Sequence, residues 1–336
     1  MKISVIGAGS WGIALTKLLT VNNNELTVWS IDPEEIVMLK QYCEHKTKLP
    51  GVILPGTVTF TTDLEMAIND KEMLVVAVPS PFIRSTAHAM APYVKEGQLI
   101  VSVAKGIEES TLMRMSEVIS DEIPQVGKNL AVLSGPSHAE EVGKCMPTTV
   151  VAGAKEYEVA RKVQDTFMND FFRVYTSPDM VGIELGAALK NVIALAAGIA
   201  DGLGCGDNTK AALITRGIVE ISKLGVKMGG HPETFSGLTG IGDLIVTCAS
   251  VHSRNRKAGY LIGQGMNYHE AMDEVKMIVE GVYSAKAAVM LAEKYNVEMP
   301  IVESVNKILF EDLPAKDALN LLLTRDKKDE ISVAAW

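Results

Sequence analysis

The first half of the chain alternates short apolar runs with stretches that have the spacing of amphipathic helices. Unbroken runs such as MLVVAV (73–78) and LIVSV (99–103) are typical of strands that are buried on both faces. Such strands predict a parallel β-sheet with helices on both sides. The predicted strands cover residues 2–6, 25–29, 57–60, 73–78, 98–103, 129–133, 148–152 and 171–175. The first predicted helix follows residue 12, and the others cover residues 33–43, 63–68, 82–91, 110–121 and 156–169.

The pattern changes at Ser177-Pro178-Asp179, after which helical spacing dominates the chain. The predicted helices there cover residues 180–203, 209–228, 256–263, 268–274, 281–295, 301–310 and 315–323. We therefore expect an α/β domain over residues 1–178 and an all-helical domain over residues 179–336. The charged run TRDKKDE (324–330) before the terminal ISVAAW indicates a loosely held tail.

A glycine-rich turn follows the first predicted strand and reads GAGSWG (7–12). This G-x-G-x-x-G stands between a strand and a helix that leads to a second strand, which is the context of a dinucleotide site. In such a turn Gly7 permits the tight bend, Gly9 lets a pyrophosphate approach the backbone, and Gly12 allows close helix packing. We therefore expect residues 1–178 to form a Rossmann-like dinucleotide-binding domain and the helical residues 179–336 to form the substrate domain. The alternative is an ordinary glycine turn.

One apolar stretch in the second half, residues 184–208, predicts a helix that is packed on nearly every side. It contains Lys190 and Asn191, and burial lowers the pKa of a lysine. A dinucleotide domain followed by a shielded lysine predicts hydride transfer between a nicotinamide and a carbonyl or alcohol, with Lys190 as proton donor and acceptor. The alternative is a lysine that reaches the surface or forms only a salt bridge.

Two further segments carry polar groups that suit a substrate. The loop 252–257 (HSRNRK) leads into a helix and offers cations and backbone donors to a phosphate, although it is equally a solvated basic patch. The glycine-dense segment 237–244 ends near Asp243, which stands either in the site or at a helix N-cap.

The composition limits the kinds of partner and ligand that the protein is expected to bind. The net charge of −9 argues against nucleic acid or an anionic membrane as the main partner, so an anionic substrate needs a local positive site. The histidines show no metal-ligand spacing and the four cysteines form no CxxC, so we expect no metal and reduced thiols. No run has the length of a signal peptide or of a membrane span, and we therefore expect a cytoplasmic protein without an integral membrane segment.

Seven segments in order resemble motifs of the NAD(P)-dependent glycerol-3-phosphate dehydrogenase family of the bacterial biosynthetic type. They are GAGSWG (7–12), SVAKGIE (102–108), LSGPSHAEEV (133–142), ELGAALKN (184–191), GDNTKAALITRG (206–217), GLTGIGDLIVTC (237–248) and SRNRKAG (253–259). Because they span almost the whole chain, the resemblance is specific.

The resemblance implies reversible reduction of dihydroxyacetone phosphate to sn-glycerol 3-phosphate with NAD(P)H, for glycerophospholipid synthesis. It implies Lys190 as the proton donor and acceptor, with Lys105, Asn191, Asp243 and Thr247 as the other catalytic residues. The implied substrate-binding residues are Lys105, Gly135, Ser137, Lys190, Asp243, Ser253, Arg254 and Asn255. The expected cofactor-binding residues are Gly7, Gly9, Ser10, Trp11, Gly12, Asp32, Lys105, Ala139, Arg254 and Glu280. Lys105 is expected to lower the pKa of Lys190 by like-charge repulsion.

The second strand is followed by Ser30-Ile31-Asp32, where the family frequently has a basic residue for the 2′-phosphate of NADP. Asp32 lies where an acid accepts the ribose hydroxyl of NAD, and it is equally placed to cap the helix that begins at Pro33. We therefore expect NAD, or use of both cofactors.

Two other functions remain open from the sequence. A related two-domain hydroxyacid dehydrogenase shares this layout and takes a carboxylate instead of a phosphate. A non-catalytic dinucleotide sensor also fits the first domain, although it has no use for Lys105, Lys190, Asp243 and Arg254 together. On the resemblance alone we expect a homodimer through the helical domain.

Overall fold

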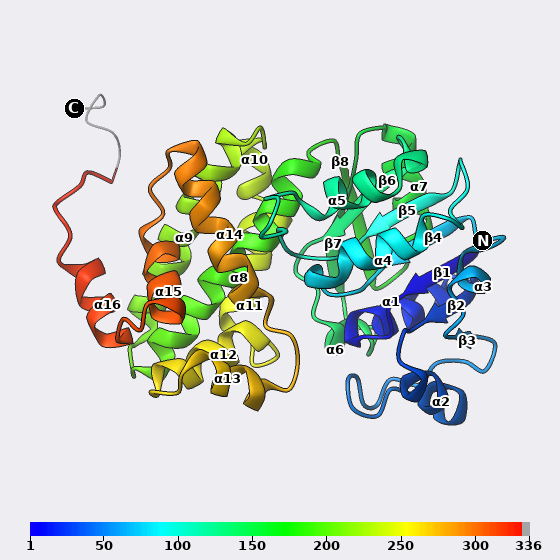
Figure 1. Cartoon of the computed structure of the whole chain (residues 1–336), viewed down its shortest axis with the longest axis horizontal. Helices are drawn as coiled ribbons and strands as arrows, with labels where there is room; N and C mark the ends of the chain where they lie inside the picture. Colours follow the sequence, from blue (N-terminus) through cyan, green and yellow to red (C-terminus); the bar gives the residue numbers. More distant parts are fainter. Residues whose placement is uncertain (331–336) are drawn as a thin grey trace.

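One eight-stranded sheet organises the first domain of the computed structural model, which describes residues 1–330 (Figure 1). The strand order is β3-β2-β1-β4-β5-β6-β7-β8. The strands are β1 (Lys2–Ile6), β2 (Glu25–Trp29), β3 (Thr59–Thr61), β4 (Met73–Val76), β5 (Leu99–Ser102), β6 (Leu130–Ser134), β7 (Thr148–Ala154) and β8 (Phe172–Ser177). Strands β1 to β6 pair in parallel.

The expectation of a parallel sheet is wrong at one edge, where β7 pairs antiparallel with β6 while β8 is parallel to β7. The connection from β6 to β7 contains only the short helix α6 (Ala139–Val142). A parallel neighbour is usually reached through a crossover helix that carries the chain back to the other end of the sheet, and the four-residue helix α6 is too short to do this.

Alternate residues of the central strands point into two separate cores. Ile3 and Val5 of β1 belong to the core under α1 (Ser10–Val21), α2 (Pro33–Tyr42) and α7 (Tyr157–Phe167). Ile6 belongs to the core on the opposite face, under α3 (Leu64–Ile68), α4 (Ile83–Met90) and α5 (Met115–Glu122). The prediction of helices on both faces is confirmed.

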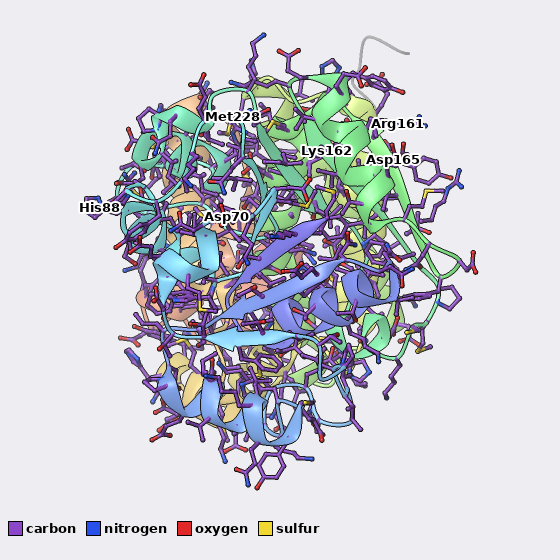
Figure 2. The ribbon with its side chains drawn as sticks, turned by 90° about the vertical axis from the view of Figure 1, so that its right-hand side faces the viewer. Asp70, His88, Arg161, Lys162, Asp165 and Met228 are labelled. Carbon is purple, nitrogen blue, oxygen red and sulfur yellow. The ribbon has the colours of Figure 1, made fainter. Side chains whose placement is uncertain are left out.

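Helix α7 shows how such a surface helix is divided between core and solvent. Its residues Ala160, Val163 and Phe167 are buried against the sheet. Arg161, Lys162 and Asp165 lie on its exposed side (Figure 2). This division gives the 3.6-residue periodicity from which the helix was predicted.

Helix α8 (Met180–Gly202) is the centre of the second domain, and residues 182–200 are buried without a break. The helices around it are α9 (Asp207–Lys227), α10 (Pro232–Phe235), α11 (Asp243–Ala249), α12 (Arg254–Gly263), α13 (Tyr268–Val275), α14 (Glu280–Tyr295), α15 (Pro300–Phe310) and α16 (Ala315–Leu323), with a π-helical turn η3 (Leu238–Gly242) before α11. Within residues 1–330, α8 has the length and apolar character of a membrane span, as does the bent pair 232–249 and 254–263, but the apolar stretch of α8 is wholly buried inside the domain.

Small residues bring α8 and α12 into backbone contact. A Cβ added to Gly198 would lie 2.1 Å from the Arg256 carbonyl oxygen, and one added to Gly259 would lie 2.2 Å from that of Leu195. Any side chain at these positions forces the two helices apart. The close approach predicted from the Gly and Ala content of α8 is therefore confirmed, and it fixes the position of the residues at the start of α12.

The structure differs from the predicted helices mainly at short elements. The helix predicted over 110–121 begins only at Met115, because residues 107–114 form a tight hairpin with Leu112 at φ 62°. Helices α10 and α11 were missed because they are too short for a clear period. The predicted tail includes residues 331–336, which lie outside the described residues.

Candidate active site

Two lysines from the two domains meet at one buried carboxylate. Lys190 of α8 donates to Asp243 Oδ1 over 2.6 Å, and Lys105, which follows β5, donates to Oδ2 of the same group over 2.9 Å. Asp243 is the first residue of α11 and is 1% exposed. The Asp243 carboxylate therefore bridges the domains, and its role as a helix cap is excluded because α11 has no side-chain cap.

Lys190 is enclosed instead of reaching the surface. It is 4% exposed, and its ammonium also donates to Thr247 Oγ1 over 2.7 Å. The Thr247 hydroxyl in turn donates to the Asp243 carbonyl oxygen one turn earlier, over 2.6 Å. The interpretation of Lys190 as a surface-reaching lysine is wrong, and the ammonium sits in a fixed polar pocket inside an apolar domain.

Opposing effects set the protonation of this cluster. The net pKa of Lys190 is lowered to about 8: burial lowers it most, the Asp243 carboxylate raises it, and the Lys105 cation lowers it. The predicted repulsion by Lys105 is present, but burial is the larger cause. Burial raises the pKa of Asp243, but the two lysines outweigh it, so that the net shift of the pKa is downward. The lowered pKa of Asp243 favours its ionised form, and the lowered pKa of Lys190 brings the loss of its proton closer to neutral pH.

An amide chain extends the site from α8 to α12. Asn255 Nδ2 donates to Asn191 Oδ1 over 3.0 Å, and the backbone N–H of Gly281 donates to Asn255 Oδ1 over 2.9 Å. These bonds orient the Asn191 amide, whose Nδ2 is buried without a partner among the described residues. A buried donor of this kind is normally satisfied, so Asn191 Nδ2 is available to a bound oxygen.

The basic loop is arranged at the start of α12. Ser253 caps this helix by accepting from the backbone N–H of Arg256 over 3.2 Å. Arg256 forms a salt bridge with Asp201 at 2.7 Å, whereas Arg254 is exposed and forms no salt bridge with any residue of 1–330. The helix N-terminus and Arg254 are therefore the groups of this loop that suit an anion.

The loop after β6 approaches Lys105 from the other side. The Gly135 carbonyl oxygen accepts from Lys105 Nζ over 3.3 Å and from Ser137 Oγ over 2.9 Å. Gly135 has φ 144°, and a Cβ there would lie 3.0 Å from Val150 Cα. Only glycine fits this position, and the two hydrogen bonds place Gly135 and Ser137 beside Lys105.

The turn between β1 and α1 has the shape that a pyrophosphate requires. Gly7 has φ 118°, and a Cβ at Gly12 would lie 2.0 Å from the Gly7 carbonyl oxygen. Nothing lies within 4 Å of a Cβ built on Gly9, and α1 has no side-chain cap. The indole Nε1 of Trp11 is buried without a partner among the described residues. These features fit a dinucleotide, because the turn leaves open space at Gly9 directly before the N-terminal N–H groups of α1.

The remaining predicted cofactor residues lie around this turn and the domain junction. Asp32 caps α2, accepting from the Glu34 N–H over 2.9 Å, so the capping interpretation is confirmed. Ser10 Oγ donates to the Lys48 carbonyl oxygen over 2.8 Å. Ala139 begins α6 and Glu280 begins α14, where burial raises the pKa of Glu280.

The sequence analysis missed an ion pair that joins the two domains. Arg114 Nη1 lies 2.5 Å from Glu184 Oε2, and the Ser116 backbone N–H donates to Glu184 Oε1 over 2.8 Å. Glu184 lies on α8, upstream of Lys190. The signal that pointed to Lys190, a charge inside an apolar helix, applies equally to Glu184.

Comparison with known proteins covers nearly the whole chain. Residues 2–160 match the family model described as NAD-dependent glycerol-3-phosphate dehydrogenase N-terminus, and residues 179–320 match the corresponding C-terminus model. Glycerol-3-phosphate dehydrogenase [NAD(P)+] of Agathobacter rectalis is 64% identical over 335 residues, covering 100% of this chain and 99% of that protein. The protein of the same name from Bacillus subtilis is 50% identical over 98% of this chain and 96% of its own length. The crystal structure of glycerol-3-phosphate dehydrogenase from Coxiella burnetii has a TM-score of 0.92 at 34% identity, covering 96% of this chain and 99% of that chain.

Proposed function

Because the chain belongs to the NAD-dependent glycerol-3-phosphate dehydrogenase family, we propose that it interconverts dihydroxyacetone phosphate and sn-glycerol 3-phosphate, with Lys190 as proton donor and acceptor. The observation that carries the assignment of Lys190 is its enclosed ammonium, held at 2.6 Å by Asp243. A buried lysine with a lowered pKa is typical of proton transfer.

The chemistry follows from the charges of the chain. In the reducing direction, negative charge grows on the ketone oxygen, and the Lys190 ammonium neutralises it by giving up a proton. Asp243 keeps the amine in place, and Lys105 adds a second positive charge at the same oxygen. The nicotinamide, when bound, supplies or accepts the hydride. A positioned proton donor of this kind contributes about 10²–10⁴-fold in rate.

The phosphate of the substrate is assigned to the start of α12. Ser253, Arg254 and Asn255 combine a helix N-terminus, an arginine without a salt bridge and a buried amide. Asn191 Nδ2, which is oriented by Asn255, is assigned to a substrate oxygen. Gly135 and Ser137 complete the substrate site next to Lys105.

The cofactor is assigned to the β1–α1 turn and to the side of the helical domain that carries Lys190. The backbone of the turn holds the pyrophosphate, and Asp32 accepts a hydroxyl of the adenosine ribose, which favours NAD or use of both cofactors. The residues that complete this assignment are Gly7, Gly9, Ser10, Trp11, Gly12, Lys105, Ala139, Arg254 and Glu280.

The same proposal extends to the cellular role. Family membership supports a cytoplasmic enzyme that supplies sn-glycerol 3-phosphate for glycerophospholipid synthesis and forms a homodimer through its helical domain. Light scattering on the purified full chain tests the dimer, and a monomeric mass contradicts it.

An absorbance assay tests the reaction itself. The purified chain is mixed with NADH or NADPH and a panel of phosphorylated and carboxylated ketones. Loss of reduced nicotinamide with dihydroxyacetone phosphate, well above that with the carboxylated ketones, supports the proposal. Preference for a carboxylated ketone identifies a hydroxyacid dehydrogenase instead, and no oxidation with any ketone overturns the assignment.

A further inference from the structure

The segment that carries Lys105 is anchored in both domains. Residues 105–114, named here the Lys105 segment, form a hairpin in which Ile107 pairs with Arg114 and the Glu108 N–H donates to the Met113 carbonyl oxygen over 2.9 Å. Ile107 is 4% exposed and belongs to the core of the helical domain. The segment therefore leaves β5 of the first domain and places an apolar side chain in the second.

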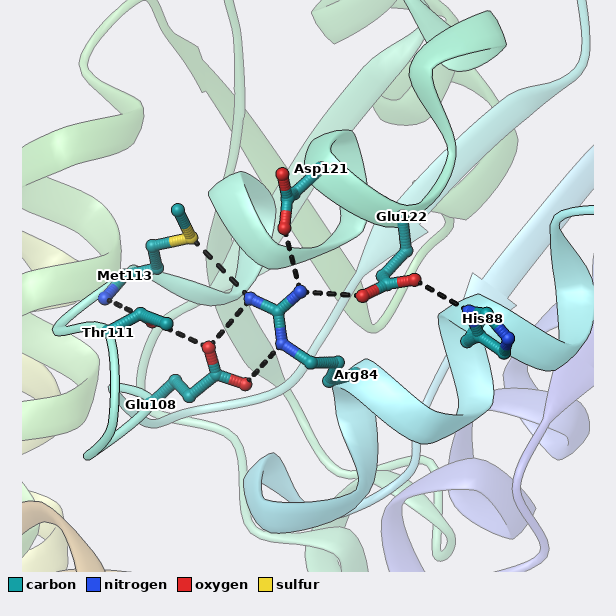
Figure 3. A network of polar contacts seen from close by, with 7 residues as sticks. All are labelled: Arg84, His88, Glu108, Thr111, Met113, Asp121 and Glu122. Carbon is teal, nitrogen blue, oxygen red and sulfur yellow. Dashed lines mark hydrogen bonds and ion pairs between the residues drawn. The ribbon is translucent and has the colours of Figure 1, made fainter.

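A bidentate ion pair joins this segment to α4 of the first domain. Arg84 Nε donates to Glu108 Oε1 over 2.8 Å, and Arg84 Nη2 donates to Glu108 Oε2 over 2.7 Å. Figure 3 shows the guanidinium between Glu108 on one side and Asp121 and Glu122 of α5 on the other. Bidentate arginine–carboxylate pairs fix orientation as well as distance. The Glu108 carboxylate is thus held in one geometry.

The same part of the first domain touches the segment at a second point. A Cβ added to Gly106 would lie 2.3 Å from the Cβ and Oγ of Ser80, which opens the short helix η1 (Ser80–Phe82) before α4. Gly106 directly follows Lys105, and Gly106 and Glu108 flank Ile107. The backbone after Lys105 is therefore packed against η1 and α4 on one side and against the core of the helical domain on the other.

We propose that Arg84 and Glu108 are positioning residues, which act through the Lys105 segment to hold the Lys105 ammonium at its place in the site. The proposal rests on the proposed function, in which Lys105 and Lys190 share Asp243. Neither Arg84 nor Glu108 is assigned any contact with substrate or cofactor.

If the Arg84 network only stabilised the fold, its acidic residues would contribute to activity in the same way. Asp121 accepts from Arg84 Nη1 over 2.7 Å, as close a contact as that of Glu108, but it lies on α5 and its side chain is 52% exposed. If Arg84 only joins α4 to α5, loss of Asp121 and loss of Glu108 have similar effects. If Arg84 positions Lys105, only the loss of Glu108 reaches the site.

Displacement of Lys105 has a defined electrostatic consequence. The charged or titratable groups that act on Lys190 are Asp243, Lys105, Glu280, His138 and Cys248. When the Lys105 cation moves away, Lys190 no longer has a like charge nearby. The Asp243 carboxylate then pairs with Lys190 alone. Both changes raise the pKa of Lys190.

The test compares Glu108→Gln and Arg84→Lys with the matched control Asp121→Asn, all in the full chain. Glutamine keeps the size of Glu108 but lacks one acceptor oxygen, and lysine keeps the charge of Arg84 but lacks its fork. Two readouts are taken: kcat and KM for dihydroxyacetone phosphate, and the titration of Lys190 followed by NMR on protein with ¹³Cε-labelled lysine. The Lys190 signal is assigned by its loss in Lys190→Arg, and the titration requires no cofactor or turnover.

We expect kcat to fall roughly tenfold or more in Glu108→Gln and Arg84→Lys, since a displacement of about 1 Å can cost that much. The Lys190 midpoint is expected to rise by roughly half a pH unit in both variants and to stay unchanged in Asp121→Asn. The inference is overturned if Glu108→Gln matches Asp121→Asn in kcat and in the Lys190 midpoint. If the midpoint shifts but the wild-type chain reduces no ketone phosphate, the proposed function fails while the positioning role stands.

Discussion

Lys190 Nζ lies 2.6 Å from Asp243 Oδ1, and both side chains are almost completely removed from solvent. The pair joins the long core helix of the second domain to the first residue of a short helix that the sequence pattern did not reveal. Burial alone would neutralise the amine, and the carboxylate alone would keep it charged. Their balance holds the pKa of Lys190 at about 8, so proton donation and proton acceptance are both accessible near neutral pH.

Removal of the amine should abolish most turnover. In Lys190→Ala we expect kcat to fall by about 10²–10⁴-fold, because the proton donor is lost while Lys105 still pairs with Asp243. Cofactor affinity, measured by nicotinamide fluorescence, and the melting temperature should change little. Lys227→Ala, an exposed lysine on α9, is the control. Near-normal kcat in Lys190→Ala would contradict the assignment.

The two reaction directions should have opposite pH dependence. Ketone reduction needs protonated Lys190, so its kcat/KM should fall as the pH rises through about 8. Alcohol oxidation needs the neutral amine, so its kcat/KM should fall as the pH drops below about 8. Rate profiles in both directions between pH 6 and pH 10 check this. If kcat/KM instead falls on the same side of about pH 8 in both reaction directions, a group other than Lys190 controls the rate.

Loss of the exposed arginine at the start of α12 should weaken substrate binding. In Arg254→Ala we expect KM for dihydroxyacetone phosphate to rise by about 10–100-fold, since a charge-assisted hydrogen bond contributes about 1.5–3 kcal/mol. The effect on kcat should be smaller. The neighbouring exposed Lys257→Ala serves as the control. An unchanged KM in Arg254→Ala means that the phosphate binds elsewhere.

Cofactor choice is tested at the residue that caps α2. Asp32→Ser keeps an N-cap side chain, so stability should be preserved, but it removes the negative charge that we assign to the adenosine ribose. We expect the ratio of kcat/KM for NADPH to that for NADH to rise about tenfold, as repulsion of the 2′-phosphate disappears. Steady-state kinetics with both cofactors measure the ratio. A strong NADPH preference in the wild type would refute the expected use of NAD or of both cofactors.

Local patterns determined much of the fold. The strands at residues 2–6 and 25–29 and the helix at 315–323 lie where the sequence predicts them. An apolar run or a helical period is a property of neighbouring residues, and the faces that it buries follow from backbone geometry. The same reasoning predicted the glycine turn at 7–12 and a buried Lys190. The positions of Lys105 and Asp243 in one site came from the family resemblance, because neither stands in a pattern that reveals its partner.

Tertiary structure alone decided which side chains meet. β7 runs antiparallel to β6 because the four-residue helix α6 between them does not carry the chain back along the sheet. Asp243 reaches both lysines only because η3 and α11 pack against α8 beside the first domain. The Arg84–Glu108 and Arg114–Glu184 pairs likewise join residues that no local periodicity relates. Periodicity shows which face of an element is buried, whereas the partner of a buried charge depends on the packing of the whole chain.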